Sequence, residues 1–507
     1  MIALPNLAGD GGIPSPGKDP EDCARAMWTR PEKPKTHDHT VNSTGPARAA
    51  RVGAAGTLAV LLAVFVIMLD TTVVNLAVPD IRRDLRTTGA GGQWTVNAYN
   101  VAIAAVLLSA GALADRLGPR RVFAAGLAVF ALASAACALS PTAAALIGAR
   151  VLQGLGGAAV MASGLALVAA LHPADAARTR ALAWWAAVVG AGTVLGPCGG
   201  GLLLESLGWR AVFWLNIPFA AVALAVLAIR VPPVPGRARP LDPAGQVAAA
   251  AVLTATAFAA TAAGNRDWSA DFVVAVGAAG LGLAALVVTE RRARAPMLPP
   301  QLLGARAFLA PILLGGLLSF GVYGGLFVLS AYFQLSRGLP VAAAGLAILP
   351  FAAAAALAAP LAARLAGRCD ARQVLAAGLI SLAAGAGLVA ACASCPQWWP
   401  VATAEALLGI GHALLQPALT AAALRAAGRT RTGTGSGVLA ATRQTGSVLG
   451  VALLGGLVAD PAAAGRGTGA AFAVIATMFA AATLLHLAVA GRPVRQRSSP
   501  TTKEDNS

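Results

Sequence analysis

The chain has 507 residues, of which 57% are hydrophobic and only 12% charged, and its mean hydropathy is +0.71. A soluble domain carries about 25% charged residues, so this composition excludes a water-soluble globular protein and indicates an integral membrane protein. The net charge of +17 would suit nucleic-acid binding, but the basic residues lie between apolar runs, and we expect no nucleic-acid partner.

Residues 1–50 are rich in Pro, Gly and charged residues without an apolar period, which predicts a disordered tail. Fourteen apolar runs follow, and each holds roughly the 20 residues that a helix needs to cross a ~30 Å hydrocarbon core. The runs are continuous and rich in Ala and Leu, which favours helices over strands. We place them at 57–79, 94–114, 121–140, 142–168, 181–204, 209–229, 244–263, 271–289, 308–334, 341–365, 373–393, 399–424, 436–459 and 468–490.

Two basic breaks divide these runs into groups of six, two and six. The first is the linker 230–242, and the second contains Arg291, Arg292 and Arg294. We therefore predict an N-terminal six-helix bundle at 51–230, a linker with two transmembrane helices at 231–305, a C-terminal six-helix bundle at 306–490 and a polar tail at 491–507. The segments at 111–121 and 363–372 lie at matching positions of the two bundles, which supports a duplication.

The distribution of arginines predicts the orientation in the membrane. Counted with the adjoining helix ends, the inner loops hold 18 Lys and Arg and the outer loops hold 7. This positive-inside pattern places both termini in the cytoplasm. The first outer loop is an exception to this pattern, because it contains Arg82, Arg83 and Arg86. Asp80 and Asp84 partly offset their positive charge, and we expect a short amphipathic helix there.

Asp70 and Arg150 are charged residues at depth in the membrane, where charge is costly. At 1.5 Å per residue, Asp70 lies ~13 Å below the outer edge of the first span and Arg150 ~12 Å below that of the fourth. The side chains are therefore level and able to pair. Burial favours a neutral carboxyl group and a nearby guanidinium favours the charged form, so a conformational change can move a proton. We predict a proton-coupling pair; a static structural ion pair is the alternative.

Other titratable groups within spans have weaker assignments. Glu405, about six residues into the twelfth span, is a candidate for binding a proton or a cationic substrate, or else a carboxylate that reaches the interface. His412 titrates near neutrality in principle, but a hydrogen-bonded packing histidine is the better interpretation. Cys392 and Cys395 form a CxxC pair, with a disulfide outside the cytoplasm or no role as the alternatives.

The fifth run contains VVGAGTVLGPCGGG (188–201), with five glycines and a proline between Gly190 and Gly200. Such a helix is kinked and lies against a neighbour with almost no gap. We interpret it as a seal or pivot between the bundles, and ordinary small-residue packing is the alternative. The sequence has no GxxxxGK[ST] or HExxH motif, so we predict no enzyme activity, no metal and no cofactor, and a pump would draw on an ion gradient.

Six segments in order carry a family resemblance. The first four are LDTTVVNLAVPDI (69–81), GALADRLGPRR (111–121), ARVLQGLGGA (149–158) and the glycine-rich 188–201, and the last two are WRAVFWLNIP (209–218) and RQTGSVLGVALLG (443–455). Over roughly 55–490 the chain resembles the major facilitator superfamily, and within it the fourteen-span drug:proton antiporters. The segment 188–201 resembles the antiporter motif, which importers of the superfamily generally lack.

The resemblance implies an all-α integral membrane protein with the major facilitator fold, in which 14 transmembrane helices form two six-helix bundles plus two inserted helices. It also implies alternating access by rocking of the two bundles. It implies gating or conformational roles for Gly111, Asp115, Arg116, Gly118, Arg120, Arg121, Gly192, Gly196, Pro197, Gly199 and Gly200. With Asp70 and Arg150 for coupling, the candidates for lining the substrate cavity are Gln153, Glu405, His412 and Gln444.

The leading hypothesis is a proton-coupled antiporter that exports a small, partly apolar toxic compound, such as an antibiotic, across the cytoplasmic membrane. Its partners are then the drug, protons and the lipid bilayer, and we expect a monomer. An uptake symporter of the same fold is an alternative that the glycine-rich fifth span disfavours. A membrane sensor or scaffold without transport is a second alternative, which the absence of an appended signalling domain disfavours.

Overall fold

A computed structural model describes residues 46–172, 175–236, 243–264, 268–293, 304–368, 370–428 and 432–490. The chain divides into two units, Met1–Ala49 and Ala50–Ser507. The tail predicted at 491–507 lies outside the described residues, as does that at 1–50 apart from residues 46–50. The long apolar helices lie in the second unit.

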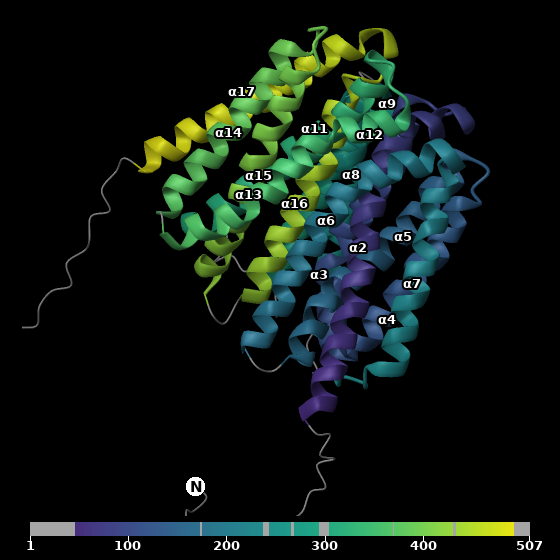
Figure 1. Cartoon of the computed structure of the whole chain (residues 1–507), viewed down its shortest axis with the longest axis vertical. Helices are drawn as coiled ribbons and strands as arrows, with labels where there is room; N and C mark the ends of the chain where they lie inside the picture. Colours follow the sequence, from purple (N-terminus) through teal and green to yellow (C-terminus); the bar gives the residue numbers. More distant parts are fainter. Residues whose placement is uncertain are drawn as a thin grey trace, which may run out of the picture. The chain divides into compact units, whose positions relative to one another are not determined.

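The described part of this unit is helical almost throughout, as its Ala- and Leu-rich runs predict (Figure 1). The first helices are α2 (Pro46–Asp84), α3 (Gly89–Leu117), α4 (Pro119–Ala138), α5 (Ala143–Leu171), α6 (Asp175–Leu207) and α7 (Arg210–Arg230). After them come α8 (Pro243–Gly264) and α9 (Ala270–Arg292). The rest are α11 (Arg306–Ala331) with the π-helix η1 (Tyr332–Ser336), α12 (Val341–Ala347), α13 (Leu349–Arg368), α14 (Ala371–Cys392), α15 (Trp399–Ala427), α16 (Thr432–Gly456), the short η2 (Pro461–Ala463) and α17 (Ala464–Ala490).

Each of the fourteen predicted ranges overlaps a helix. Among the described residues, 12 helices are long and apolar enough to cross a membrane, and α3 makes 13 if its two segments, bent by 52°, form one span. The remaining range, 181–204, lies in α6, where several side chains fall outside the described residues. An all-helical membrane protein is thus confirmed, and the count of fourteen stays a prediction.

The helix contacts fall into two groups. In the first half, α5 packs on α3 and α4, and α4 packs on α7. In the second half, α11 packs on α16, α15 on α13 and α14, and α14 on α17. In Figure 1, α4, α5 and α7 accordingly lie together at the right, and α14 and α17 lie at the upper left. Helix α8 contacts both halves, through α3 and α16, and pairs with α9.

Two sets of contacts define the sides of the first half. On what we call the Asp84 side, Arg210 at the start of α7 pairs with Asp84 at 2.5 Å and donates to the carbonyl of Ser140. On the Gly118 side, Arg120 donates to the carbonyl of Leu227 near the end of α7. Neither name refers to a side of the membrane.

The buried apolar residues show where the halves meet. One cluster joins the Asp84 side of the first half with the second half, and it includes Val73, Leu76, Phe327 and Phe351. Towards the Gly118 side the core separates. One cluster there contains only α2–α7 residues and the following Val231, and two smaller ones contain only second-half residues.

The first loop corrects one prediction. Arg82 and Arg83 lie in the last turn of α2, so the expected separate amphipathic helix is wrong. The helix simply continues past Pro79, and Arg83 pairs with Asp80 one turn back at 3.2 Å. Arg86 then turns the chain with a φ of 49° before α3 begins.

Candidate functional site: a buried polar network in the first half

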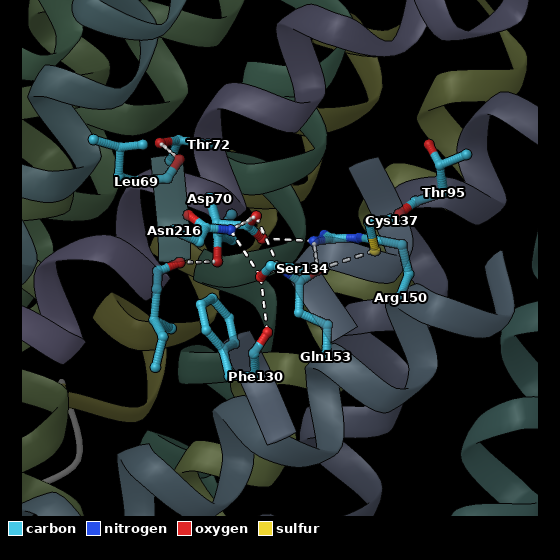
Figure 2. Close-up of polar contacts among 12 residues, drawn as sticks. Leu69, Asp70, Thr72, Thr95, Phe130, Ser134, Cys137, Arg150, Gln153 and Asn216 are labelled. Carbon is cyan, nitrogen blue, oxygen red and sulfur yellow. Dashed lines mark hydrogen bonds and ion pairs between the residues drawn. The ribbon is translucent and has the colours of Figure 1, made fainter. Parts of the chain in front are cut away.

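A polar network lies inside the first half, at the meeting point of four helices (Figure 2). Helix α2 contributes Asp70, α4 contributes Ser134, α5 contributes Arg150 and Gln153, and α7 contributes Asn216. Asp70, Gln153, Ser134 and Asn216 have no exposed surface, and Arg150 is 1% exposed. Burial of so much polarity costs free energy unless the groups satisfy one another.

Asp70 is the acceptor at the centre of this network. Its Oδ2 accepts from Nη1 of Arg150 at 2.5 Å, which makes the pair a buried salt bridge. Its Oδ1 accepts from Nε2 of Gln153 at 3.1 Å and from Nδ2 of Asn216 at 2.8 Å. Three donors from two other helices therefore converge on one carboxylate, which suits its ionised form.

Arg150 is fixed by three kinds of partner besides Asp70. Its Nη1 also donates to Oε1 of Gln153 at 2.6 Å, and its Nε donates to the carbonyl of Thr95 at 2.9 Å. The guanidinium carbon lies 4.1 Å from the centre of the Tyr99 ring, which gives a cation–π contact. The planar group is thus held in one orientation within the membrane.

Ser134 completes the network as a junction. Its hydroxyl donates to the carbonyl of Phe130 at 2.8 Å and accepts from Gln153 at 2.8 Å and Asn216 at 3.2 Å. One donor and two acceptors are all that a hydroxyl offers, so Ser134 is saturated. Asn216 and Ser134 were missed from the sequence, although an amide within the apolar run 209–229, about as deep as Arg150, was a usable signal for Asn216.

Small residues bring these helices close enough for the network to form. A Cβ on Gly154 of α5 would lie 2.5 Å from the carbonyl oxygen of Tyr99 on α3. A Cβ on Gly156 would lie 2.6 Å from the backbone nitrogen of Phe130 on α4 and 2.7 Å from the oxygen of Gly126. Such distances are tighter than side-chain contacts allow, so these glycines permit backbone-to-backbone packing.

The loop motif at 111–121 lies at the Gly118 side. Gly118 has a φ of 92°, which favours glycine, and a Cβ there would meet the carbonyl of Val234 in the segment after α7. Arg120 holds the same end of α7 through the carbonyls of Leu227 at 3.3 Å and Ala228 at 3.4 Å. Asp115 and Gly111 are half-buried near the end of α3, and Arg116 and Arg121 are exposed.

Glycines at four-residue spacing turn one face of α6 towards α2. A Cβ on Gly192 would lie 2.7 Å from Cβ of Met68, one on Gly196 would meet the hydroxyl of Thr72, and one on Gly200 would meet the side chain of Val73. Gly199 points elsewhere: it is exposed and has open space around it. The side chain of Pro197 lies outside the described residues.

The other candidates lie in the second half. Glu405 is fully buried in α15 and does not reach an interface, His412 lies two turns further along α15, and Gln444 is half-buried on α16. None of the hydrogen bonds between described residues joins them to the Asp70 network, and Gln153 alone of the proposed cavity residues belongs to it. Cys392 and Cys395 are both free thiols.

Known proteins resemble this chain over most of its length. The family model of the Major Facilitator Superfamily matches residues 60–355 and 312–507. A methylenomycin A resistance protein of Streptomyces coelicolor is 36% identical over 82% of this chain and 90% of its own length. The puromycin resistance protein of Streptomyces alboniger is 35% identical over 79% and 80%, and a multidrug efflux pump of Mycolicibacterium smegmatis is 35% identical over 65% and 66%.

The fold has a counterpart among solved structures. A crystal structure of a POT family transporter in complex with a thioalcohol-conjugated peptide superposes with a TM-score of 0.64. It covers 86% of this chain and 96% of the other at 15% sequence identity, so the likeness concerns the fold alone. With the family model spanning the apolar region and resistance proteins related at about 35% identity, the chain belongs to the Major Facilitator Superfamily, as a membrane transporter and not an enzyme.

Proposed function

We propose that this protein exports a small, partly apolar antibiotic or related toxic compound in exchange for protons. The proposal is carried by Asp70: a fully buried carboxylate that accepts hydrogen bonds from Arg150, Gln153 and Asn216. The substrate class comes from the relatives, which include proteins of resistance to methylenomycin A, puromycin and several drugs.

Protonation of Asp70 would disrupt the hydrogen-bond pattern of its network. The neutral acid loses its attraction for Arg150, and one of its oxygens becomes a donor that faces other donors. Arg150, Gln153 and Asn216 all point donors at this carboxyl group, so the added proton has no acceptor in the present arrangement. Helices α2, α5 and α7 then relax by moving relative to one another, which is how a proton changes conformation here.

The contacts between halves support a state that is closed on the Asp84 side. Pro79 has no N–H, so the carbonyl of Asn75 four residues earlier lacks its helical partner. That carbonyl accepts from the hydroxyl of Ser330 at 3.2 Å, and the next one, of Leu76, accepts from Gln334 at 3.2 Å. The proline therefore creates an attachment point on α2 for α11 and η1.

A third contact reinforces the closure, since the carboxylate of Glu205 accepts from the backbone nitrogen of Ala342 at 3.3 Å. Under the orientation that the arginine distribution favours, with both termini in the cytoplasm, the Asp84 side faces outward. The described conformation is then the one that takes up substrate from the cytoplasm. The loop at 111–121 and the α2–α6 glycine contact act in the transition to the opposite state.

Asp70→Asn is the decisive variant, because it keeps the size of the side chain and removes titration. We expect it to abolish drug export driven by an imposed pH gradient in everted vesicles, at normal membrane levels. Asp271→Asn is the matched control, since Asp271 is an exposed acid at the start of α9. It should transport normally.

Growth of a pump-deficient host on an antibiotic panel identifies the substrate for these vesicles. Full drug/proton exchange by Asp70→Asn would refute the role of this carboxylate. Drug accumulation driven in the same direction as the proton would instead identify an uptake symporter.

A further inference from the structure

The two halves contain a repeat that identifies which positions correspond. ARVLQGLGGA (149–158) on α5 aligns with AEALLGIGHA (404–413) on α15, and GTVLG (192–196) on α6 aligns with GSVLG (446–450) on α16. In the first alignment, Glu405 occupies the position of Arg150. The contacts that the glycines make in the structure test this correspondence independently of the sequence alignment.

Equivalent glycines make equivalent contacts. A Cβ on Gly154 would meet the carbonyl of Tyr99 on α3, and one on Gly409 would meet the carbonyl of Phe351 on α13. A Cβ on Gly156 would lie against α4, and one on Gly411 would lie 2.8 Å from the oxygen of Gly378 on α14. Glu405 therefore lies in the second half where Arg150 lies in the first.

Three other members of the polar network around Arg150 have apolar counterparts in the second half. The same contacts align Asp70 with Gly321, Ser134 with Ala386 and Gln153 with Leu408. A Cβ on Gly321 would lie 2.7 Å from the ring of Phe479, so an aromatic ring fills the space next to it. Ala386 and Leu408 belong to the buried apolar cluster. The second half thus has an ionisable group at this position without the polar network that surrounds its counterpart.

Glu405 consequently has no cationic or side-chain partner for a negative charge. It has no exposed surface, and neither carboxylate oxygen has a hydrogen-bond partner. The peptide group of Phe351, in the first turn of α13, lies beside it. The N–H of that peptide group favours a negative charge, but a fully buried carboxylate with no cation beside it remains disfavoured, whereas a bound proton makes the group neutral.

None of the described titratable or charged side chains on the helices around α15 forms a hydrogen bond or ion pair with Glu405. The described ones are Arg364 on α13, Arg372 and Cys392 on α14, Arg306 and Tyr323 on α11, and Arg443 on α16. Arg443 donates to Gln416 and Thr420, which follow Glu405 on α15 by ~16 Å or more at 1.5 Å per residue. His412 on α15 itself is ~10 Å along, and its Nδ1 has no hydrogen-bond partner.

We propose that Glu405 is a second proton-binding site of this transporter, in the C-terminal half, at the position equivalent to Arg150. A proton is the ligand because the fully enclosed carboxyl group offers no surface to a larger cation. The site rests on the proposed proton-coupled function, and it would give each half one carboxyl group that exchanges protons during transport: Asp70 in the first and Glu405 in the second.

Infrared spectroscopy of the full-length protein in lipid bilayers tests this without a substrate. The wild type should show a protonated-carboxyl C=O band that declines as the pH is raised, because alkali removes the proton from the buried carboxyl group. Glu405→Gln should lose that band, and so should Glu405→Leu, which matches the apolar surroundings. Asp271→Asn, at an exposed acid, should retain it.

The infrared results decide whether Glu405 binds a proton. An unchanged band in both Glu405 variants, or a wild type without a titrating protonated carboxyl group, would overturn the proposal. Absence of drug/proton exchange by the wild type, together with a positive infrared result, would refute the transport function while leaving Glu405 as a proton site. The reverse combination would leave Asp70 as the single coupling carboxylate.

Discussion

The contact between α2 and α6 gives the sharpest prediction, because two adjacent glycines of α6 have opposite surroundings. A Cβ on Gly200 would lie 2.5 Å from Cγ1 and 2.9 Å from Cβ of Val73, whereas a Cβ on Gly199 would meet nothing within 4 Å. Carbon atoms pack at about 3.5–4.0 Å, so Gly200→Ala requires α2 and α6 to separate locally by roughly 1 Å. Val73 is β-branched and stiff, so it cannot rotate away.

The magnitude follows from two opposing terms. Alanine gains about 1 kcal/mol over glycine in a helix interior, and overpacking a tight contact costs about 1–3 kcal/mol. The first term is common to both variants, so Gly199→Ala should stabilise the protein slightly. Gly200→Ala should be about 1–3 kcal/mol less stable than Gly199→Ala. Because α2 carries Asp70, Gly200→Ala should also reduce export or leak protons.

Thermal unfolding in detergent and pH-gradient decay in vesicles measure these effects side by side. Val73→Ala removes the two methyl groups that the new Cβ would meet, so the double variant with Gly200→Ala should be less destabilised than the sum of the two single changes. Equal unfolding midpoints and equal export for Gly199→Ala and Gly200→Ala would show that this contact is not tight. The glycine-rich segment would then be ordinary packing.

Three further predictions concern coupling, closure and orientation. Arg150→Met should shift the pH optimum of transport, and combined with Asp70→Asn it should show a coupling energy on the order of 1–3 kcal/mol in unfolding; additive effects would contradict a direct pair. Gln334→Ala removes a contact between the halves, so backbone hydrogen exchange in the last turns of α2 should rise, and unchanged exchange would argue against the closure. A cysteine at Thr88 should react with a membrane-impermeant reagent from outside and one at Arg120 should not; the reverse pattern would invert the topology.

The sequence located Asp70 and Arg150 because charge is rare inside membranes and because helical rise converts sequence position into depth. The structure then shows them joined at 2.5 Å. Ser134 and Asn216 were not found, since uncharged polar residues carry little cost when they bond within a helix or bundle. Their role depends on which faces of α4 and α7 meet, and that is settled by contacts between helices distant in sequence.

Two other features were beyond sequence reasoning for similar reasons. The closure by Ser330 and Gln334 depends partly on the carbonyl of Asn75, which Pro79 leaves without a helical partner. The sequence does not show that α11 and η1 pack against α2 at this point and supply the donors. The surface helix expected around Arg82 was wrong because α2 continues to Asp84. The charge pattern indicated a boundary with water but not where the helix ends.

The placement of α8 makes the two flanks of the transporter unequal. Its Phe258 packs on Trp94 of α3 at 5.9 Å between ring centres, and a Cβ on its Gly264 would meet the carbonyl of Ala452 on α16. The junction of α3 with α16 is thus covered by an inserted helix, whereas at the other junction α6 packs directly on α12 and α13. The bilayer therefore meets an inserted helix along one flank of the transporter, and the bundle helices themselves along the other, so substitutions on the lipid-facing side of α8 should affect only the first flank.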